Sequence, residues 1–515
     1  MFASLLKLGA VVSLASTAVA QAAIPNDIGN GVHVPGAIPA ELNEPLQHRL
    51  AFHGSTGMTV SWSSFIQLSQ PTVHYGTDPA KLDQVATSQV STTYPTSRTY
   101  NNHVVLSGLK PATKYYYTVS FTNQGYAAYR PTYSFTTARA AGDMTSFSFA
   151  VYGDLGLMGH DGLSTVTGPG NSDTWAVLGP SETNTIQSLL SQKDTYDFMH
   201  HVGDIGYADY FLKESVQGLF GIGTNETQPS RQEVATQYES LSEQFFDQMQ
   251  PITAEKPWMV TPGNHEANCD NGGVTDKSAH IAYTSDYCLE GQTNFTFYRE
   301  HYRMPSDVGT QGLENFWYSY DYGMAHFVSL DTETDLGKDL PGPIENATGN
   351  VNGPFGYPNQ QINWLINDLR RVNRKKTPWV VVFLHRPWYT STSPPTWPAW
   401  QQAFEKIFYD YGVDVYLNGH VHNYESFMPM FNGTVDPSGL NNPRAPWPIL
   451  NGAAGHYDGL DHFDSGAPYN GSAFGDDQDF TWGRMTFVDA QHLKYELVAS
   501  RNSSVIDTAT LYKKR

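Results

Sequence analysis

The 515-residue chain is poor in cysteine and in positive charge. Two cysteines allow one internal disulfide at most, and 30 Lys and Arg stand against 50 Asp and Glu, a formal net charge of −20. Nucleic-acid phosphates favour basic surfaces, so this balance argues against a nucleic-acid partner. Any phosphate chemistry here must take its positive charge from a local source such as metal ions.

No apolar run after residue 20 approaches the ~20 residues that a membrane span needs. Residues 1–20, by contrast, combine Lys7, an apolar stretch and the small residues Ala18-Val19-Ala20. This pattern predicts a secretory signal peptide, with a buried N-terminal helix as the alternative. The polar end Leu511–Arg515 gives no sign of a lipid-anchor tail, so we expect a secreted, extracellular protein without a membrane partner. Six sequons are candidate glycosylation sites: Asn225, Asn294, Asn346, Asn432, Asn470 and Asn502.

In an oxidising compartment, Cys269 and Cys288 are expected to form one disulfide. This disulfide would close a loop that begins five residues after Asn264 and would hold the rim of the site described below. Two free buried thiols are the alternative.

The length predicts more than one domain. Residues 21–44 are rich in Pro, Gly and Asn and predict an extended arm. Residues 45–139 alternate between short strands and turns without a helical stretch, and Trp62 with the turn at 109–115 resembles a fibronectin III-like β-sandwich. Residues 431–515 return to strand-like runs and predict a C-terminal extension that packs on the catalytic domain.

Between residues 145 and 430 the pattern changes to strand, loop and helix, which predicts an α/β layered domain. A strand pair is expected near 314–331. The expected strands are 147–152, 196–202, 258–260, 379–384 and 413–417, and the expected helices are 183–193, 233–250, 359–373 and 398–411.

A polar block follows each of these five strands, where α/β folds place their chemistry. The blocks supply seven oxygen or nitrogen donors, enough for two metal ions that share one carboxylate. Each block alone is weak evidence, because a lone Gly-Asp or His-x-His is more often a turn or a surface pair. Their common position at five strand ends is what favours a metal site. The donors are Asp154, Asp204, Tyr207, Asn264, His385, His420 and His422.

Tyr207 indicates which metal is bound. An unperturbed phenol ionises near pH 10, so a tyrosinate ligand at lower pH requires a strongly Lewis-acidic ion. Fe(III) meets this demand, and the sequence therefore predicts Fe(III) paired with a divalent Zn, Fe or Mn ion.

The ordered set Asp-x-Gly, Gly-Asp-x-x-Tyr, Gly-Asn-His-Glu, Val-x-x-His and Gly-His-x-His resembles the purple acid phosphatases among the binuclear metallophosphoesterases. The sandwich before the catalytic domain and the extension after it are similar to the large plant and fungal form. In the wider superfamily the first block is usually Asp-x-His, and the tyrosine of the second block is absent. Here Gly156 takes the place of that histidine and Tyr207 supplies the missing ligand.

The resemblance implies a secreted acid phosphatase that hydrolyses phosphate monoesters by attack of a metal-bound hydroxide. It assigns Asp204 as the bridge between the two ions. His265 is implied to protonate the leaving group or to stabilise charge at phosphorus, with orientation of the ligands as the alternative role. The other ligands divide into Asp154, Tyr207 and His422 for one ion and Asn264, His385 and His420 for the other.

One departure concerns the substrate. Plant relatives carry further histidines after the Val-x-x-His block, whereas this chain continues Arg386-Pro-Trp-Tyr389 without one. Asn264, His265, Arg386, Tyr389 and His456 are therefore the candidate substrate-binding residues, with a salt bridge and packing as alternatives for Arg386 and Tyr389.

Other functions stay open at this stage. The same centre could act as a phytase or as a nucleotide phosphodiesterase or pyrophosphatase. A non-enzymatic carbohydrate-binding or surface protein with structural metals, and redox chemistry at iron, are further alternatives. The oligomeric state is not indicated by the sequence.

Overall fold

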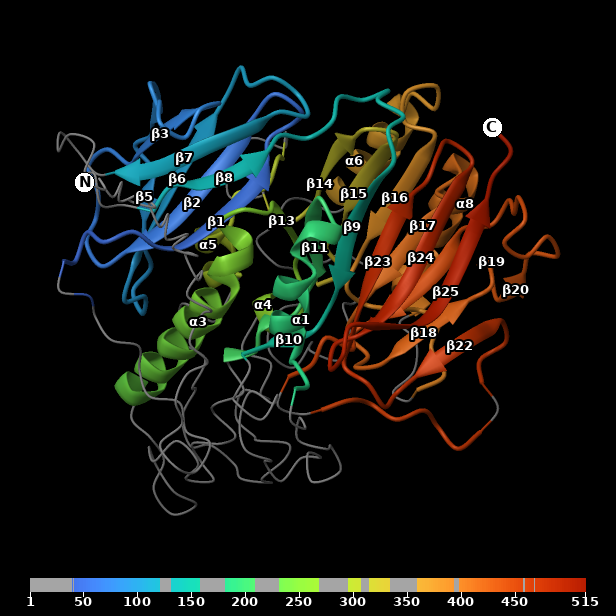
Figure 1. Ribbon diagram of the computed structural model, residues 1–515. Coiled ribbons are helices and arrows are strands. Elements are labelled where there is room, and N and C mark those ends of the chain that lie inside the picture. Colours follow the sequence, from blue (N-terminus) through green and yellow to red (C-terminus); the bar gives the residue numbers. More distant parts are fainter. Residues whose placement is uncertain are drawn as a thin grey trace, which may run out of the picture.

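The structure is a computed structural model that describes residues 39, 41–120, 131–157, 181–208, 231–267, 295–306, 315–333, 359–392, 398–456, 459–466 and 468–515 (Figure 1). The expected signal peptide, most of the expected arm, Cys269, Cys288, Asn225, Asn294 and Asn346 lie outside the described residues. Among the described residues, no helix is both long and apolar enough to cross a membrane.

The N-terminal region is a β-sandwich of two four-stranded antiparallel sheets. One sheet has the order β1-β2-β6-β5, with β1 Leu46–Phe52, β2 Met58–Ser64, β6 Tyr100–Leu106 and β5 Ser91–Thr92. The other has the order β4-β3-β7-β8, with β4 Gln84–Thr87, β3 Thr72–Gly76, β7 Lys114–Ser120 and β8 Tyr133–Thr136. The side chains of Trp62, Val73, Val104 and Tyr117 fill the space between the sheets, as the alternating sequence predicts.

Two larger sheets form the α/β part of the molecule. The six-stranded sheet has the order β13-β11-β9-β23-β24-β25, with β13 Trp258–Thr261, β11 Phe198–Val202, β9 Phe147–Tyr152, β23 Thr481–Phe487, β24 His492–Ala499 and β25 Ser504–Tyr512. The seven-stranded sheet has the order β14-β15-β16-β17-β21-β18-β22, with β14 Tyr318–Tyr322, β15 Ala325–Ser329, β16 Trp379–Phe383, β17 Val415–Asn418, β21 Trp447–Asn451, β18 Tyr424–Phe427 and β22 Ser472–Asp476.

An aromatic layer joins the two large sheets face to face. Phe149 of β9 packs edge-on against Phe327 of β15 and Phe383 of β16, with ring centroids 5.4 and 5.9 Å apart. All three rings are fully buried. Because two apolar sheet faces must be covered at once, this layer explains why the central strands are uniformly hydrophobic.

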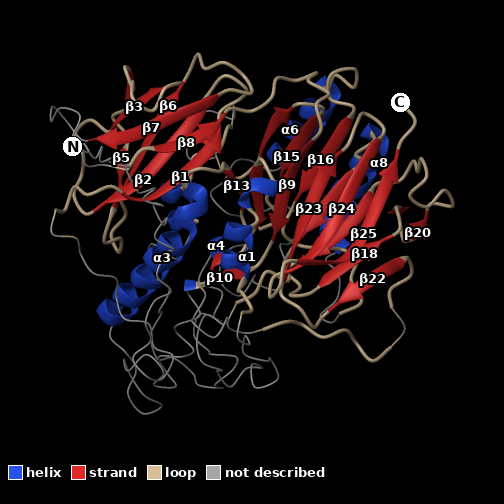
Figure 2. Ribbon diagram, viewed as in Figure 1, coloured by secondary structure: helices blue, strands red, loops and turns tan. Residues whose placement is uncertain are grey.

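Helices pack beside the two large sheets (Figure 2). The expected helices are confirmed as α1 Thr185–Ser191, α3 Arg231–Thr253, α6 Gln360–Arg371 and the series α7 Pro398–Trp400, η6 Gln401–Glu405 and α8 Lys406–Tyr411. Asn184 caps α1 by accepting from the backbone N–H of Gln187, whose side chain accepts from the backbone of Asn184 in return. Two short helices, α4 Asn264–Ala267 and α5 Thr296–His301, and the 3₁₀ helix η2 Lys193–Thr195 complete the described set.

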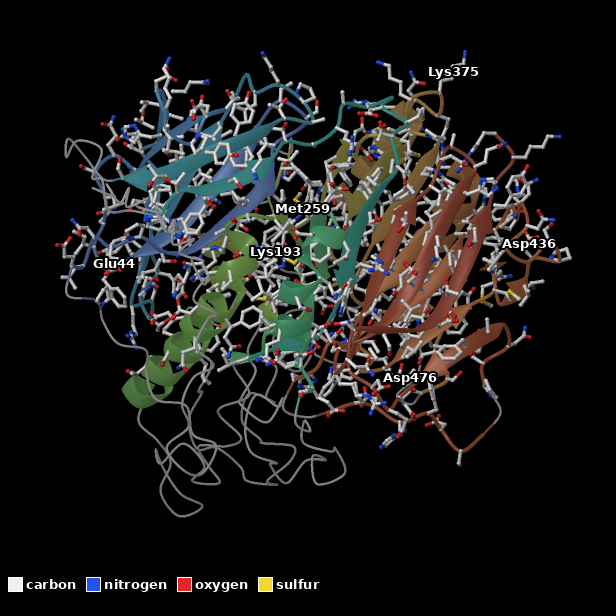
Figure 3. All side chains as sticks on the ribbon, in the orientation of Figure 1. Glu44, Lys193, Met259, Lys375, Asp436 and Asp476 are labelled. Carbon is white, nitrogen blue, oxygen red and sulfur yellow. The ribbon has the colours of Figure 1, made fainter. Side chains whose placement is uncertain are left out.

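The sandwich rests on α3 and on the edge strand β13. The backbone N–H of Phe52 points at Met259 Sδ, 3.4 Å away, and Met259 lies between the sandwich and the sheets in Figure 3. On α3, Glu239 accepts hydrogen bonds from the hydroxyls of Tyr94 (2.7 Å) and Thr96 (3.0 Å). The sandwich is thus attached to the catalytic sheets through buried contacts.

Strands from residues 431–515 complete both large sheets. β21 lies between β17 and β18, and β23 pairs with β9 in antiparallel register. The boundary expected at residue 430, like the other domain limits, stays a prediction. The parallel strands β9, β11, β13, β16 and β17 all end on the same side of the sheets, toward the region of Figure 1 where β10 (Leu155–Gly156) and α4 are labelled.

Candidate metal centre

Three of the five loops that follow the strands contain residues in unusual backbone conformations. Asp154, Asp204, Tyr207 and His420 all have positive φ angles, of 62°, 54°, 51° and 73°. For residues other than glycine such conformations cost roughly 1 kcal/mol each, and they persist where surrounding contacts enforce them. Strain of this kind concentrates at functional sites.

Glycines let these loops approach the carboxylates closely. A Cβ atom on Gly263 would lie 2.2 Å from Asp204 Oδ1, and one on Gly419 would lie 2.4 Å from Asp154 Oδ2. Neither position has room for a side chain. The Gly-Asn-His and Gly-His-x-His patterns therefore have a steric reason in this fold.

One group of donors gathers around the phenol of Tyr207. Its hydroxyl donates to Asp154 Oδ1 at 2.9 Å and lies 3.2 Å from Asp204 Oδ2 and 3.2 Å from His422 Nε2. Asp154, Asp204 and His422 offer ligand atoms within 4.8 Å of one another. Tyr207 completes this group.

A second group gathers around Asn264. Its Oδ1 lies 3.0 Å from His385 Nε2 and 2.7 Å from His420 Nδ1. His385 Nε2 is in turn 3.1 Å from Asp204 Oδ2, so the same carboxylate oxygen borders both groups. The structure thus brings together all seven donors expected from the sequence, with Asp204 between the two groups.

The charges of this cluster fit bound cations. Asp154 and Asp204 are buried, and among the described residues they pair with the histidines His265, His385 and His422. Burial raises the pKa of Asp154, and the nearby Asp204 raises it further. Burial also raises the pKa of Asp204, but His385 and His265 lower it well below its usual range. Oxygen and imidazole donors around two buried carboxylates suit two metal ions.

Surrounding groups orient the histidine donors. His385 Nδ1 lies 2.9 Å from the carbonyl oxygen of Val202, which leaves Nε2 free to bind a cation. Arg386 Nη1 lies 3.2 Å from His420 Nε2 and holds the ring with its Nδ1 toward Asn264 and the centre. The guanidinium is itself held by Glu333, which accepts from Nε at 2.8 Å and from Nη2 at 2.8 Å.

Sequence reasoning missed two carboxylates that support the site. Glu266 accepts from the backbone N–H groups of Gly263, Asp204 and Ile205 at 2.8, 2.9 and 2.7 Å, which ties two ligand loops together. The Asn-His-Glu motif contained this signal. Glu333 follows β15 without a recognisable motif, and no local pattern could have identified it.

His265 lies beside the cluster. Its backbone N–H donates to Asp204 Oδ1 at 3.0 Å, its ring centroid is 4.5 Å from that of Tyr207, and its Nε2 is 3.9 Å from Asp204 Oδ2. The side chain is 7% exposed, whereas those of the ligands Asp204 and His385 are at most 1% exposed.

The other candidate substrate residues have protein partners. Arg386 is buried in its ion pair with Glu333. Tyr389 donates its hydroxyl to Glu405 and accepts from the backbone N–H of Gly433, so the structure does not bring it to the cluster. His456 lies within the cluster, and its contacts are described below. Substrate contact by any of these residues stays a prediction.

Two facing sheets with metal-binding donors on the loops at one edge define a metallophosphoesterase. The calcineurin-like phosphoesterase family matches residues 147–424. The purple acid phosphatase N-terminal domain matches residues 45–137, and the iron/zinc purple acid phosphatase-like C-terminal family matches residues 445–508.

Relatives agree with this assignment. Acid phosphatase A of Cryphonectria parasitica is 37% identical over 501 residues, which cover 92% of this chain and 93% of that protein. An acid phosphatase of Aspergillus ficuum is 30% identical over 547 residues, covering 89% and 85%. The fold matches purple acid phosphatase PPD1 from yellow lupin seeds with a TM-score of 0.67 at 22% identity, over 92% of this chain and 75% of that one.

The chain belongs to the purple acid phosphatases. It is therefore a phosphatase that hydrolyses phosphate esters at a metal centre, and the family implies that this centre is binuclear.

Proposed function

We propose that the protein is a secreted acid phosphatase that hydrolyses phosphate monoesters with an Fe(III)–M(II) centre, where M is Zn, Fe or Mn. The observation that carries this proposal is the position of the Tyr207 hydroxyl, 2.9 Å from Asp154 Oδ1 and 3.2 Å from Asp204 Oδ2. A phenol so close to two carboxylates can ionise only if a strongly Lewis-acidic cation stabilises the phenolate. Fe(III) is the biological ion that best meets this condition.

Asp154, Tyr207 and His422 would hold the iron, and Asp204 would contribute to both ions. Asn264, His385 and His420 would hold the divalent ion. When bound, the two ions would polarise the phosphoryl oxygens and acidify water for in-line attack. Acidification by Fe(III) accounts for activity at low pH.

His265 is the proposed proton donor to the leaving alkoxide. Its backbone N–H is fixed to Asp204 Oδ1, and its imidazole borders the cluster. We expect His265→Asn to lower kcat by about 100-fold, because a positioned acid contributes 10²–10⁴-fold to the rate. Aryl phosphates with good leaving groups should lose less activity than alkyl phosphates, while the metal content stays unchanged. An equal loss for both substrate classes would assign His265 to orientation of the ligands.

Metal analysis combined with the visible spectrum tests the centre. The wild type should contain iron and show a tyrosinate-to-Fe(III) charge-transfer band, and Tyr207→Phe should abolish that band. Tyr389→Phe is the matched control, since Tyr389 is buried outside the cluster and should leave the band unchanged. A colourless, iron-free yet active wild type would refute the Fe(III) assignment.

The preference for monoesters is tested by comparing an aryl phosphate, phytate and a phosphodiester. One relative, from Hordeum vulgare, is named a nucleotide pyrophosphatase/phosphodiesterase and is 25% identical over 405 residues, which cover 76% of this chain and 90% of that protein. The same centre on this chain could therefore serve a diester or pyrophosphate. Faster turnover of the diester than of either monoester would replace the monoesterase proposal.

Secretion and glycosylation are supported by the three described sequons. Asn432, Asn470 and Asn502 are all exposed, so their side chains are accessible to a glycan. Enzymatic deglycosylation of protein purified from culture medium should lower its mass. An unchanged mass would show that no sequon is occupied.

A further inference from the structure

A C-terminal loop reaches into the metal centre. The backbone N–H of Gly153 donates to Asn451 O at 2.9 Å, that of Gly156 donates to Gly455 O at 2.9 Å, and that of Ala454 donates to Gly153 O at 3.3 Å. These bonds attach the loop after β21 to the loop that carries Asp154. They place His456 next to the proposed iron ligands, although it follows Asp154 by 302 residues in the sequence.

His456 occupies the space that a side chain at position 156 would need. A Cβ atom on Gly156 would lie 2.7 Å from His456 Cβ and 3.2 Å from His456 Cα. Gly156 has no positive φ angle, so its backbone conformation does not require glycine. The close approach of His456 requires it, and the histidine ring occupies the region beside the first block.

His456 contacts two of the proposed iron ligands at once. Its ring stacks on the ring of Tyr207 with centroids 4.0 Å apart and planes 10° apart. Its Nε2 lies 2.8 Å from His422 Nδ1, and its side chain is fully buried. A residue held this way cannot turn toward solvent without breaking both contacts.

The hydrogen bond between His456 and His422 determines which ring nitrogen of His422 can bind a cation. His422 Nε2 faces the Tyr207 hydroxyl and Asp154, so it must carry a free lone pair to bind a cation. Its proton then resides on Nδ1 and is donated to His456 Nε2. The carbonyl oxygen of Val202 plays the corresponding part for His385, since it accepts from Nδ1 and leaves Nε2 free for a cation.

We propose that His456 is a positioning residue that fixes both the ring plane of Tyr207 and the tautomer of His422, in space that Gly156 leaves open. This inference rests on the proposed iron centre, because its purpose is to orient two iron ligands. It gives His456 a role that is distinct from substrate contact.

Three substitutions separate the contacts. His456→Phe keeps the stacked ring and loses the hydrogen bond, His456→Gln keeps a polar group and loses the ring, and His456→Ala loses both. We expect His456→Ala to shift the tyrosinate band and to release iron to a chelator at 10- to 100-fold lower chelator concentration, with the other two variants between it and wild type. His462→Ala is the matched control on the same segment, since the His462 side chain is 54% exposed.

A double-mutant cycle in the metal-free protein tests whether His456 is the reason that position 156 must be glycine. Gly156→Ala should lower the unfolding temperature of the metal-free protein in the wild-type background and have little effect in the His456→Gly background. Equal losses in both backgrounds would overturn the steric part of the inference.

The outcomes distinguish the two proposals. A wild type without a tyrosinate band would refute the iron centre itself. A wild type with the band, together with a His456→Ala variant of identical band and iron retention, would overturn the role of His456 alone. If His456→Ala fails to fold, His456→Phe preserves the buried volume and decides the question through the same two measurements.

Discussion

The buried carboxylates near the two ends of β17 have different kinds of charged partner. Asp414, just before the strand, is surrounded by Arg374 Nη1 at 2.9 Å, Arg515 Nη2 at 3.1 Å and Lys513 Nζ at 3.4 Å. Burial raises the pKa of Asp414, but these cations, Arg515 foremost, bring it below its ordinary value. Beyond the other end of the strand, His420 borders a cluster whose carboxylates have histidine partners instead.

The difference shows what each cluster is for. A buried carboxylate that serves only the fold can be supplied with fixed cations from the chain. A buried carboxylate that must bind metal cannot, because a fixed cation would compete with the ion. Within the part of the chain that the structure describes, Asp154 and Asp204 pair with histidines, which can lose a proton and bind a metal ion instead, and four substitution or pH experiments test this contrast.

The largest effect is expected for Asp204→Ala, which removes the carboxylate shared by the two groups. We expect kcat/KM to fall by about 1,000-fold or more, with loss of at least one metal ion. Steady-state kinetics and metal analysis measure both quantities. Asp414→Asn is the control, since its folded fraction should keep full activity; an active Asp204→Ala with two bound ions would contradict the bridging role.

The free energy of unfolding should show the opposite order, with a larger loss at Asp414 than in the metal cluster. Asp414→Asn leaves several cations without a counter-charge and should lower the free energy of unfolding by about 3 kcal/mol. Asp154→Asn in the metal-free protein removes a buried charge without a fixed cation and should leave that free energy unchanged or raise it by about 1 kcal/mol. Urea unfolding of both metal-free variants tests this contrast, and equal losses would show that the two clusters do not differ.

A third way of burying carboxylates operates where α3 meets the sandwich. Glu239 and Glu243 are one helical turn apart and buried, and Arg98 Nη2 lies 3.4 Å from Glu243 Oε2. Burial raises the pKa of Glu239 to about 7 and that of Glu243 to about 8, against an ordinary value of 4.5. These groups keep protons in the folded protein.

This arrangement predicts greater stability in acid. Between about pH 4.5 and 8 the folded state binds more protons than the unfolded state, so stability falls as the pH rises through this window. From pH 5 to pH 8 we expect a loss of several kcal/mol, up to about 6 kcal/mol if both raised pKa values are fully realised, measured by chemical denaturation at constant ionic strength. The double variant Glu239→Gln/Glu243→Gln should flatten the profile, and an unchanged slope would assign the pH dependence to other groups.

The smallest effect is expected for Arg386→Lys, which keeps the charge but loses the paired hydrogen bonds to Glu333 and the fixed contact with His420. The divalent ion should be held about tenfold less tightly, while the tyrosinate band on the other side of Asp204 stays unchanged. Chelator titration followed by metal analysis and absorbance separates the two ions. Loss of the band before the divalent ion would contradict the assignment of His420.

Much of this architecture could be predicted from the sequence, because its signals are local. Hydrophobic runs marked the strands that end just before the donor residues, and the structure confirms those strands. These residues are Asp154, Asp204, Asn264, His385 and His420. Alternation likewise predicted the N-terminal sandwich. The ligands follow directly from the strand ends, so their grouping could be anticipated as well.

Contacts between distant segments could not be predicted in the same way. Glu333 meets Arg386 across 53 residues, and Gly156 meets His456 across 300. Neither pair has a periodic pattern, since each depends on how separate loops cross at a sheet edge. His456 was recognised as a candidate, but only the packed structure reveals its partners.

The insertion of β21 between β17 and β18 has a consequence for biosynthesis. The seven-stranded sheet also needs β22, which ends at Asp476, and the six-stranded sheet needs β23, β24 and β25, so both large sheets remain incomplete until most of the chain has been synthesised. The loop that carries His456 lies between β21 and β22. Stable metal uptake is therefore expected to follow release of the chain, since a ribosome-bound intermediate that stops short of this segment lacks both the sheet neighbours and the histidine that hold the ligands in place.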